Sequence, residues 1–183
     1  MTGGGDFRTA RRIAVYGVTG SGKTRAAADI GAVTGLPWHA VDELTWEPGW
    51  AEVPRDEQRR RIDAICRGDA WILDAIYSTW MDVVLDRVEV IVALDYPRWL
   101  SYGRLLRRTG RRMITREPVC NGNRETVRHV LARDSILWFH VRSFGRKRDR
   151  IRAWENDPAA PAVLRFARPR QLAAALAGPV PTT

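Results

Sequence analysis

The chain has 183 residues, a formal net charge of +9 and a hydrophobic content of 45%. This length suits one domain with a sizeable core. No apolar run approaches the length of a membrane span, and the N-terminal residues lack the apolar core of a signal peptide, so we expect no membrane partner. We expect residues 1–11 to be a flexible N-terminus, 12–178 to be the domain and 179–183 to be a flexible tail. Cys66 and Cys120 lie far apart with no metal-binding spacing, which favours a buried reduced thiol at Cys66 and a cytoplasmic location.

The first predicted elements are an apolar strand over residues 12–16 and a helix over 23–34 that ends at Gly35. Between them GVTGSGKT, residues 17–24, matches the phosphate-binding pattern G-x-x-x-x-G-K-[ST]. Its glycines let the backbone fold around phosphate oxygens, and the helix directs its positive dipole end at the same place. Lys23 supplies a charge for the β- and γ-phosphates, and Thr24 supplies a hydroxyl for Mg²⁺. The residues predicted to bind a nucleoside triphosphate are Gly17, Thr19, Gly20, Ser21, Gly22, Lys23 and Thr24.

The rest of the chain continues to alternate strand and helix signals, which predicts a parallel sheet wrapped by helices. The further predicted strands are residues 37–41, 70–74, 88–94 and 162–167. The further predicted helices are residues 55–67, 98–108, 124–144 and 169–178. Two segments are expected to lack regular structure, a loop over 43–54 and a loop or lid over 109–123.

Acidic residues follow several predicted strands, at the edge of the sheet where ligands bind in open parallel sheets. Asp74 ends an apolar strand, as expected of an acid that helps to hold Mg²⁺. Asp42 ends the second strand, where it would accept a proton from an acceptor hydroxyl or orient that hydroxyl, with Glu43 the weaker candidate. The alternative for Asp42 and Asp74 is a turn-forming role. Asp95 precedes a proline by two residues, and we interpret it as structural.

The segment 98–152 is strongly basic, with sixteen lysines or arginines and four acids. Five arginines lie at its predicted junction of helix and lid: Arg104, Arg107, Arg108, Arg111 and Arg112. Guanidinium groups neutralise the charge that spreads over the oxygens of a transferring phosphate, which makes Arg104, Arg107 and Arg108 the catalytic candidates beside Lys23 and Asp42. The alternative is a solvated basic helix face.

Three tryptophans, Trp46, Trp50 and Trp80, fall in predicted loops near the expected acceptor site. An aromatic ring there can stack on a base or cover an apolar substrate. Packing in the core or within the loop is the alternative for each of them.

The order of motifs is the glycine loop (residues 17–24), then LPWHAVDELTWEPGW, WILDAIYS and VIVALDYPRWLSYGRLLRR. It resembles the adenylate-kinase-like P-loop proteins often labelled DNA topology modulation proteins. The resemblance implies a three-layer α/β/α, nucleoside-monophosphate-kinase-like P-loop fold with an arginine-rich lid. It also implies ATP with Mg²⁺ as phosphate donor. Lys23, Thr24, Asp42 and Asp74 match the family's motifs. Ala75 and Ile76 replace its usual Gly-Asn, and Ser78 stands where nucleotide kinases have an arginine.

Three functions remain open on the sequence. The favoured one is a kinase that transfers the ATP γ-phosphate to a small acceptor, either a nucleotide or a hydroxyl metabolite. The second is a nucleic-acid-associated ATPase or ATP-dependent binding protein, and the third is a P-loop protein that binds a nucleotide without transfer. The chain shows no helix-turn-helix or zinc module, which favours the first. We expect a monomer or a homodimer.

Overall fold

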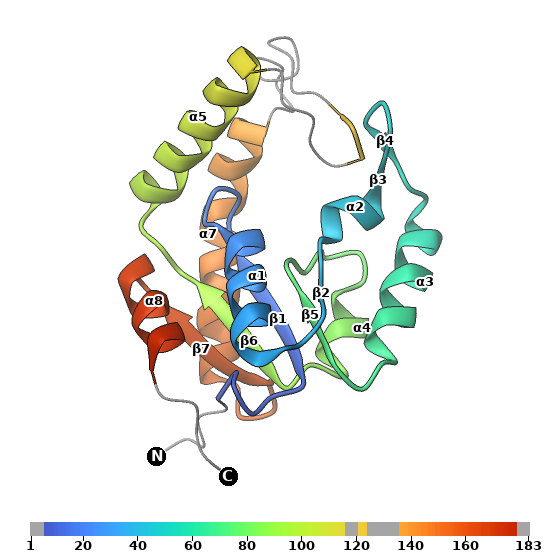
Figure 1. The fold of residues 1–183 in the computed structure, drawn as a ribbon, viewed down its shortest axis with the longest axis vertical. Helices are drawn as coiled ribbons and strands as arrows, with labels where there is room; N and C mark the ends of the chain where they lie inside the picture. The colour runs from blue at the N-terminus through green and yellow to red at the C-terminus, as the bar shows by residue number, and fades with distance from the viewer. Residues whose placement is uncertain (1–5, 116–120, 124–135, 179–183) are drawn as a thin grey trace.

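The computed structural model describes residues 6–115, 121–123 and 136–178 (Figure 1). Five strands form one parallel sheet in the order β2-β5-β1-β6-β7, and two more form a small antiparallel hairpin, β3-β4. The strands are β1 (Arg12–Gly17), β2 (Trp38–His39), β3 (Trp46–Glu47), β4 (Ala51–Glu52), β5 (Trp71–Leu73), β6 (Val90–Leu94) and β7 (Ala162–Phe166). The helices are α1 (Lys23–Thr34), α2 (Val41–Thr45), α3 (Arg55–Cys66), α4 (Met81–Leu85), α5 (Arg98–Thr115), α7 (Ile136–Asn156) and α8 (Pro169–Ala177).

The sheet is the middle of three layers. Successive side chains of a strand point to opposite faces, so β1 contributes Ala14 and Tyr16 to one core and Ile13 and Val15 to the other. The first core is completed by side chains of α3, α4 and α7, and the second by side chains of α1 and α8. Because both faces are covered, the central strands are almost continuously apolar, as the five buried residues of β6 show. The predicted α/β/α layers and five-stranded parallel sheet are confirmed.

Two predictions around the second strand are wrong. The strand is limited to Trp38–His39, and Asp42 lies in the first turn of α2 rather than at a strand end. Acidic residues in a first helical turn interact favourably with the helix dipole, which the strand prediction did not weigh. The predicted loop over residues 43–54 contains the β3-β4 hairpin, whose connection uses left-handed backbone at Gly49 and Trp50.

The helix that carries the arginines is longer than predicted. The α5 helix continues to Thr115, so the first part of the predicted lid is helical. Thr109 is 2% exposed, which shows that tertiary packing stabilises this extension although its sequence contains Gly110. Similarly, α7 continues beyond the predicted end near residue 144. Lid residues 116–120, the part of the predicted 124–144 helix over residues 124–135, and the tail 179–183 lie outside the described residues.

Residues 6–11 belong to the folded domain, where the sequence predicted a flexible segment. Phe7 is buried with the α1 and α8 core, and the Arg8 Nη2 donates hydrogen bonds of 2.6 and 2.9 Å to the carbonyls of Ala175 and Leu176. Cys66 is buried as expected, and burial raises the pKa of its thiol to about 11. None of the helices among the described residues is long and apolar enough to cross a bilayer.

Candidate active site

The glycine loop lies at the carboxyl end of β1 and leads into α1 (Figure 1). It packs directly against α5, because a Cβ atom on Gly20 would lie 2.3 Å from the Ser101 carbonyl oxygen and 2.9 Å from the Leu105 Cβ. Gly20 also has a φ of 80°, in the left-handed region that favours glycine. The loop is closed further by the Ser21 hydroxyl, which donates a 2.8 Å hydrogen bond to the Val18 carbonyl. Its shape is therefore set by α5 as well as by its own sequence.

Gly20→Ala is expected to destabilise the protein by about 2–4 kcal/mol, because the new methyl group meets backbone atoms of α5 and its residue must hold a left-handed conformation. Thermal unfolding followed by circular dichroism measures the loss. Gly103→Ala on α5 is the matched control, since nothing lies within 4 Å of a Cβ atom there. Equal melting temperatures for the two variants would contradict the packing of loop against helix.

Lys23 begins α1 and turns back over the loop. Its Nζ donates a 3.1 Å hydrogen bond to the Val18 carbonyl. Burial lowers the pKa of Lys23, while the negative charges of Asp42 and Asp74 act in the opposite direction. The lysine and both predicted acids thus lie close enough to influence one another. An ammonium group held at the mouth of a glycine loop is suited to bind phosphate oxygens.

The predicted metal residues are brought into direct contact. Asp74 is 4% exposed, and its two carboxylate oxygens accept hydrogen bonds of 2.6 Å from the Thr24 hydroxyl and 2.9 Å from the Val41 N–H. Burial raises the pKa of Asp74, and these two hydrogen bonds oppose the shift. The carboxylate is therefore positioned from two sides beside the hydroxyl.

This pair fits Mg²⁺ in one particular way. Within residues 6–115, 121–123 and 136–178, no cluster of three His, Cys, Asp or Glu side chains is arranged to hold a metal. Mg²⁺ is usually bound by one or two protein oxygens together with substrate phosphates rather than by a protein cage. Thr24 and Asp74 offer that kind of partial coordination next to a loop suited to phosphates.

Asp42 is exposed in the first turn of α2, and the Tyr77 hydroxyl donates a hydrogen bond to its Oδ1. Burial, and then the charge of Asp42, raises the pKa of Tyr77 well above its ordinary value, so Tyr77 stays a protonated donor. Sequence reasoning missed Tyr77, since its partner lies 35 positions away in the chain. The contact orients the carboxylate that the sequence assigned to the acceptor.

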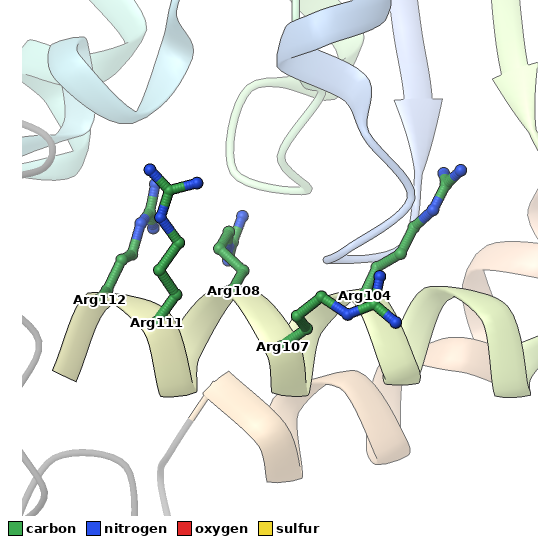
Figure 2. A pocket seen from close by; sticks show the side chains of 5 residues that line it. All are labelled: Arg104, Arg107, Arg108, Arg111 and Arg112. Atoms are coloured by element: carbon green, nitrogen blue, oxygen red, sulfur yellow. The ribbon is translucent and has the colours of Figure 1, made fainter. Parts of the chain in front are cut away.

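Five arginines of α5, from Arg104 to Arg112, line a cavity of about 370 Å³. They recur at the three- and four-residue spacing of one helix face, and Figure 2 shows Arg104, Arg108, Arg111 and Arg112 extending toward the side of the glycine loop. The Arg104 Nη1 is 3.5 Å from the Ser21 carbonyl oxygen. The charge of Arg108 contributes to lowering the pKa of Lys23. The structure therefore places Arg104 at the glycine loop and Arg108 near Lys23, and the catalytic role of the arginines stays a prediction.

Lys147 also reaches the site, from α7. Its Nζ donates a 3.1 Å hydrogen bond to the Gly17 carbonyl. In the sequence it is one basic residue among many, and no motif singles it out. Only the packing of α7 against the sheet places it at the loop.

The three tryptophans differ in their surroundings. Trp80 is fully buried in the core and stacks on Tyr77 at 5.4 Å between ring centroids, so the packing alternative holds for it. Trp46 and Trp50 pack edge to face in the β3-β4 hairpin, with 6.0 Å between their ring centroids. Asn121 ties this hairpin to the end of the lid segment through a 2.6 Å hydrogen bond from its Nδ2 to the Trp46 carbonyl. A contact between Trp46 or Trp50 and an acceptor stays a prediction.

Three other positions singled out in the sequence are buried. Ala75 and Ile76, which depart from the family pattern, pack in the core under α3 and α4. They therefore do not form an exposed loop. Asp95 is 7% exposed, 3.3 Å from the Arg148 Nε and 3.6 Å from the Arg165 Nη1, an arrangement that agrees with a structural role.

The fold is similar to that of two solved kinases. A shikimate kinase from Acinetobacter baumannii in complex with shikimate superposes with a TM-score of 0.56 and 16% sequence identity, over 92% of this chain and 90% of that one. A gluconokinase from Sinorhizobium meliloti 1021 superposes with a TM-score of 0.51 and 16% identity, over 91% of both chains. At this identity the likeness shows the α/β fold alone. No protein-family model matches the sequence, and no curated protein matches it significantly.

Proposed function

We propose that this protein is a phosphotransferase that moves the γ-phosphate of ATP, bound with Mg²⁺, to a small acceptor. The acceptor is a nucleotide or a hydroxyl metabolite. The observation that supports this most is the convergence of Lys23, Asp42 and the Thr24–Asp74 pair at the glycine loop. The sequence motifs that resemble those of the adenylate-kinase-like proteins often labelled DNA topology modulation proteins also support the proposal.

Each group has a distinct role in this proposal. The loop N–H groups and Lys23 bind the β- and γ-phosphates, while Thr24 and Asp74 hold the metal. When bound, Mg²⁺ neutralises charge on the phosphate oxygens. Asp42, oriented by Tyr77, positions the acceptor hydroxyl and accepts its proton. The arginines of α5 neutralise the charge that develops on the phosphate during transfer.

The solved neighbours support a small acceptor. The shikimate kinase was solved with shikimate, and the second neighbour is described as a gluconokinase. Both are named as kinases of a small molecule. By analogy with these two kinases, we propose that the acceptor of this protein is also a small molecule and that a hydroxyl group of it receives the phosphate.

The competing proposal is a nucleic-acid-associated ATPase, which the basic cavity of α5 favours. An Arg107→Ala, Arg108→Ala double variant separates the two. If these arginines serve the transferring phosphate, kcat falls by roughly 10²-fold or more while ATP binding changes little, because such contacts strengthen in the transition state. Arg152→Ala, an exposed position on α7, is the control.

Steady-state ADP production and a salt titration of DNA binding are measured on both variants. If α5 instead follows a nucleic-acid backbone, each lost phosphate contact changes the log–log salt slope by about 0.9. Unchanged turnover with a reduced salt slope would reject the role of these arginines in transfer.

A further inference from the structure

Two lysines that are far apart in the sequence end at neighbouring carbonyls of the glycine loop. The Lys23 Nζ donates to the Val18 carbonyl at 3.1 Å, and the Lys147 Nζ donates to the Gly17 carbonyl at 3.1 Å. Lys23 comes from α1 on one face of the sheet, and Lys147 comes from α7 on the other. Both layers of helices therefore contribute an ammonium group to the same loop.

The surroundings of Lys147 are unusual for an ammonium group. Its Nζ lies 5.5 Å from the centroid of the Tyr16 ring and 5.9 Å from that of Phe139. Among the residues that the structure describes, no carboxylate forms an ion pair with Lys147. A desolvated charge without an ion-pair partner is costly, so this site favours the arrival of an anion.

The charged groups that face Lys147 come from three elements. They are Lys23 on α1, Asp42 on α2, and Arg146 and Arg150 on α7 itself. Burial, then the charges of Lys23 and of the two arginines, lower the pKa of Lys147 to about 7, while Asp42 acts in the opposite direction. Positive neighbours outnumber the single acid, so an anion bound between the two lysines would relieve repulsion as well as desolvation.

We propose that Lys147 is a second phosphate-binding lysine. When ATP binds, its Nζ gives up the hydrogen bond to the Gly17 carbonyl and contacts the terminal phosphate beside Lys23. The inference rests on the proposed function for the identity of the ligand. The lysine of this motif serves the β- and γ-phosphates. Lys147 contacts Gly17, the loop residue farthest along the chain from α1, and the charge of Asp42 affects the pKa of Lys147. That position is the acceptor side of the loop, where the terminal phosphate would lie.

Binding is then coupled to a proton. Near neutral pH the free protein holds Lys147 only partly protonated, and a bound phosphate raises its pKa by opposite charge. ATP binding therefore takes up a proton, and the affinity for ATP falls as the pH rises above about 7. ADP lacks the terminal phosphate and shows a smaller effect.

The test is direct binding of ATP and ADP with Mg²⁺ by isothermal titration calorimetry, in buffers of different ionisation enthalpy. Lys147→Met keeps the apolar stem between Tyr16 and Phe139 and removes the charge. We expect it to weaken ATP binding roughly 10- to 100-fold, to weaken ADP binding far less, and to abolish proton uptake. Lys147→Arg is expected to restore part of the preference for ATP. Arg152→Met, exposed on the same helix, is the control.

Lys147→Gln provides the same measurement should the methionine variant fail to fold. If the Lys147 variants lose equal affinity for ATP and ADP, or lose none for either, the inference is overturned. The proposed function is unaffected by that result as long as the wild-type protein binds ATP. A wild-type protein that binds no ATP with Mg²⁺ would overturn both. Proton uptake on ATP binding that persists in a folded Lys147 variant would also reject the inference about Lys147.

Discussion

Lys23→Ala is expected to reduce ATP turnover by roughly 10³-fold, since it removes a preorganised charge from the transferring phosphate. The fold should remain intact, because Lys23 forms one hydrogen bond to the Val18 carbonyl and its burial disfavours the charged form. Removing a desolvated ammonium costs little stability. Steady-state ADP production measures turnover, and circular dichroism with a thermal melt verifies folding.

The matched control for this variant is Arg25→Ala. Arg25 is the next basic residue along α1, two positions after Lys23. It is exposed and forms an ion pair with Asp29, four residues later. Such surface pairs contribute about 0.3–0.5 kcal/mol, so this variant should fold and turn over ATP like the wild type. Turnover that survives in folded Lys23→Ala would remove the glycine loop from the mechanism.

Asp74→Asn and Asp42→Asn are expected to fail in different ways. Asp74 holds Thr24 and the Val41 N–H, so neutralising it should raise the Mg²⁺ concentration needed for half-maximal turnover by roughly 10-fold or more. Losing the Asp42 charge should lower kcat by roughly 10²- to 10⁴-fold while ATP binding persists, as expected for a general base. Mg²⁺ titrations of turnover and direct ATP binding separate the two effects.

Tyr77→Phe serves as the positioning control for Asp42. It leaves the carboxylate in place and removes the hydroxyl that orients it, so we expect a smaller loss of kcat than for Asp42→Asn. Identical Mg²⁺ titrations for Asp42→Asn and Asp74→Asn would contradict the division of roles between the two acids.

Some of this site is predictable from sequence because its determinants are local. The glycine loop is one continuous motif, and the apolar strand before Asp74 identifies both the strand and the acid that follows it. Asp42 lies close enough to Lys23 to affect its pKa, but the strand end predicted for Asp42 is wrong, because the residue belongs to α2. A short apolar run followed by acids is compatible with a strand end and with a helix start, and tertiary packing decides between them.

Other parts of the site depend on contacts across long stretches of chain. Lys147 meets Gly17 across 130 positions, and Tyr77 meets Asp42 across 35. Nothing in the local sequence separates Lys147 from its basic neighbours on α7. The extension of α5 likewise depends on burial of Thr109 rather than on periodicity. Such placements follow from how the layers of helices pack on the sheet, and local patterns in a single sequence do not predict that packing.

Transfer of labelled phosphate tests the central claim most directly. Wild-type protein and Lys23→Ala are incubated with γ-labelled ATP, Mg²⁺ and a panel of nucleoside monophosphates, nucleosides and small hydroxyl metabolites. We predict that one class of acceptor becomes labelled, in amounts equal to the ADP formed, and that Lys23→Ala abolishes this labelling. Label released only as inorganic phosphate with every acceptor, at a rate that nucleic acid stimulates, would contradict the account.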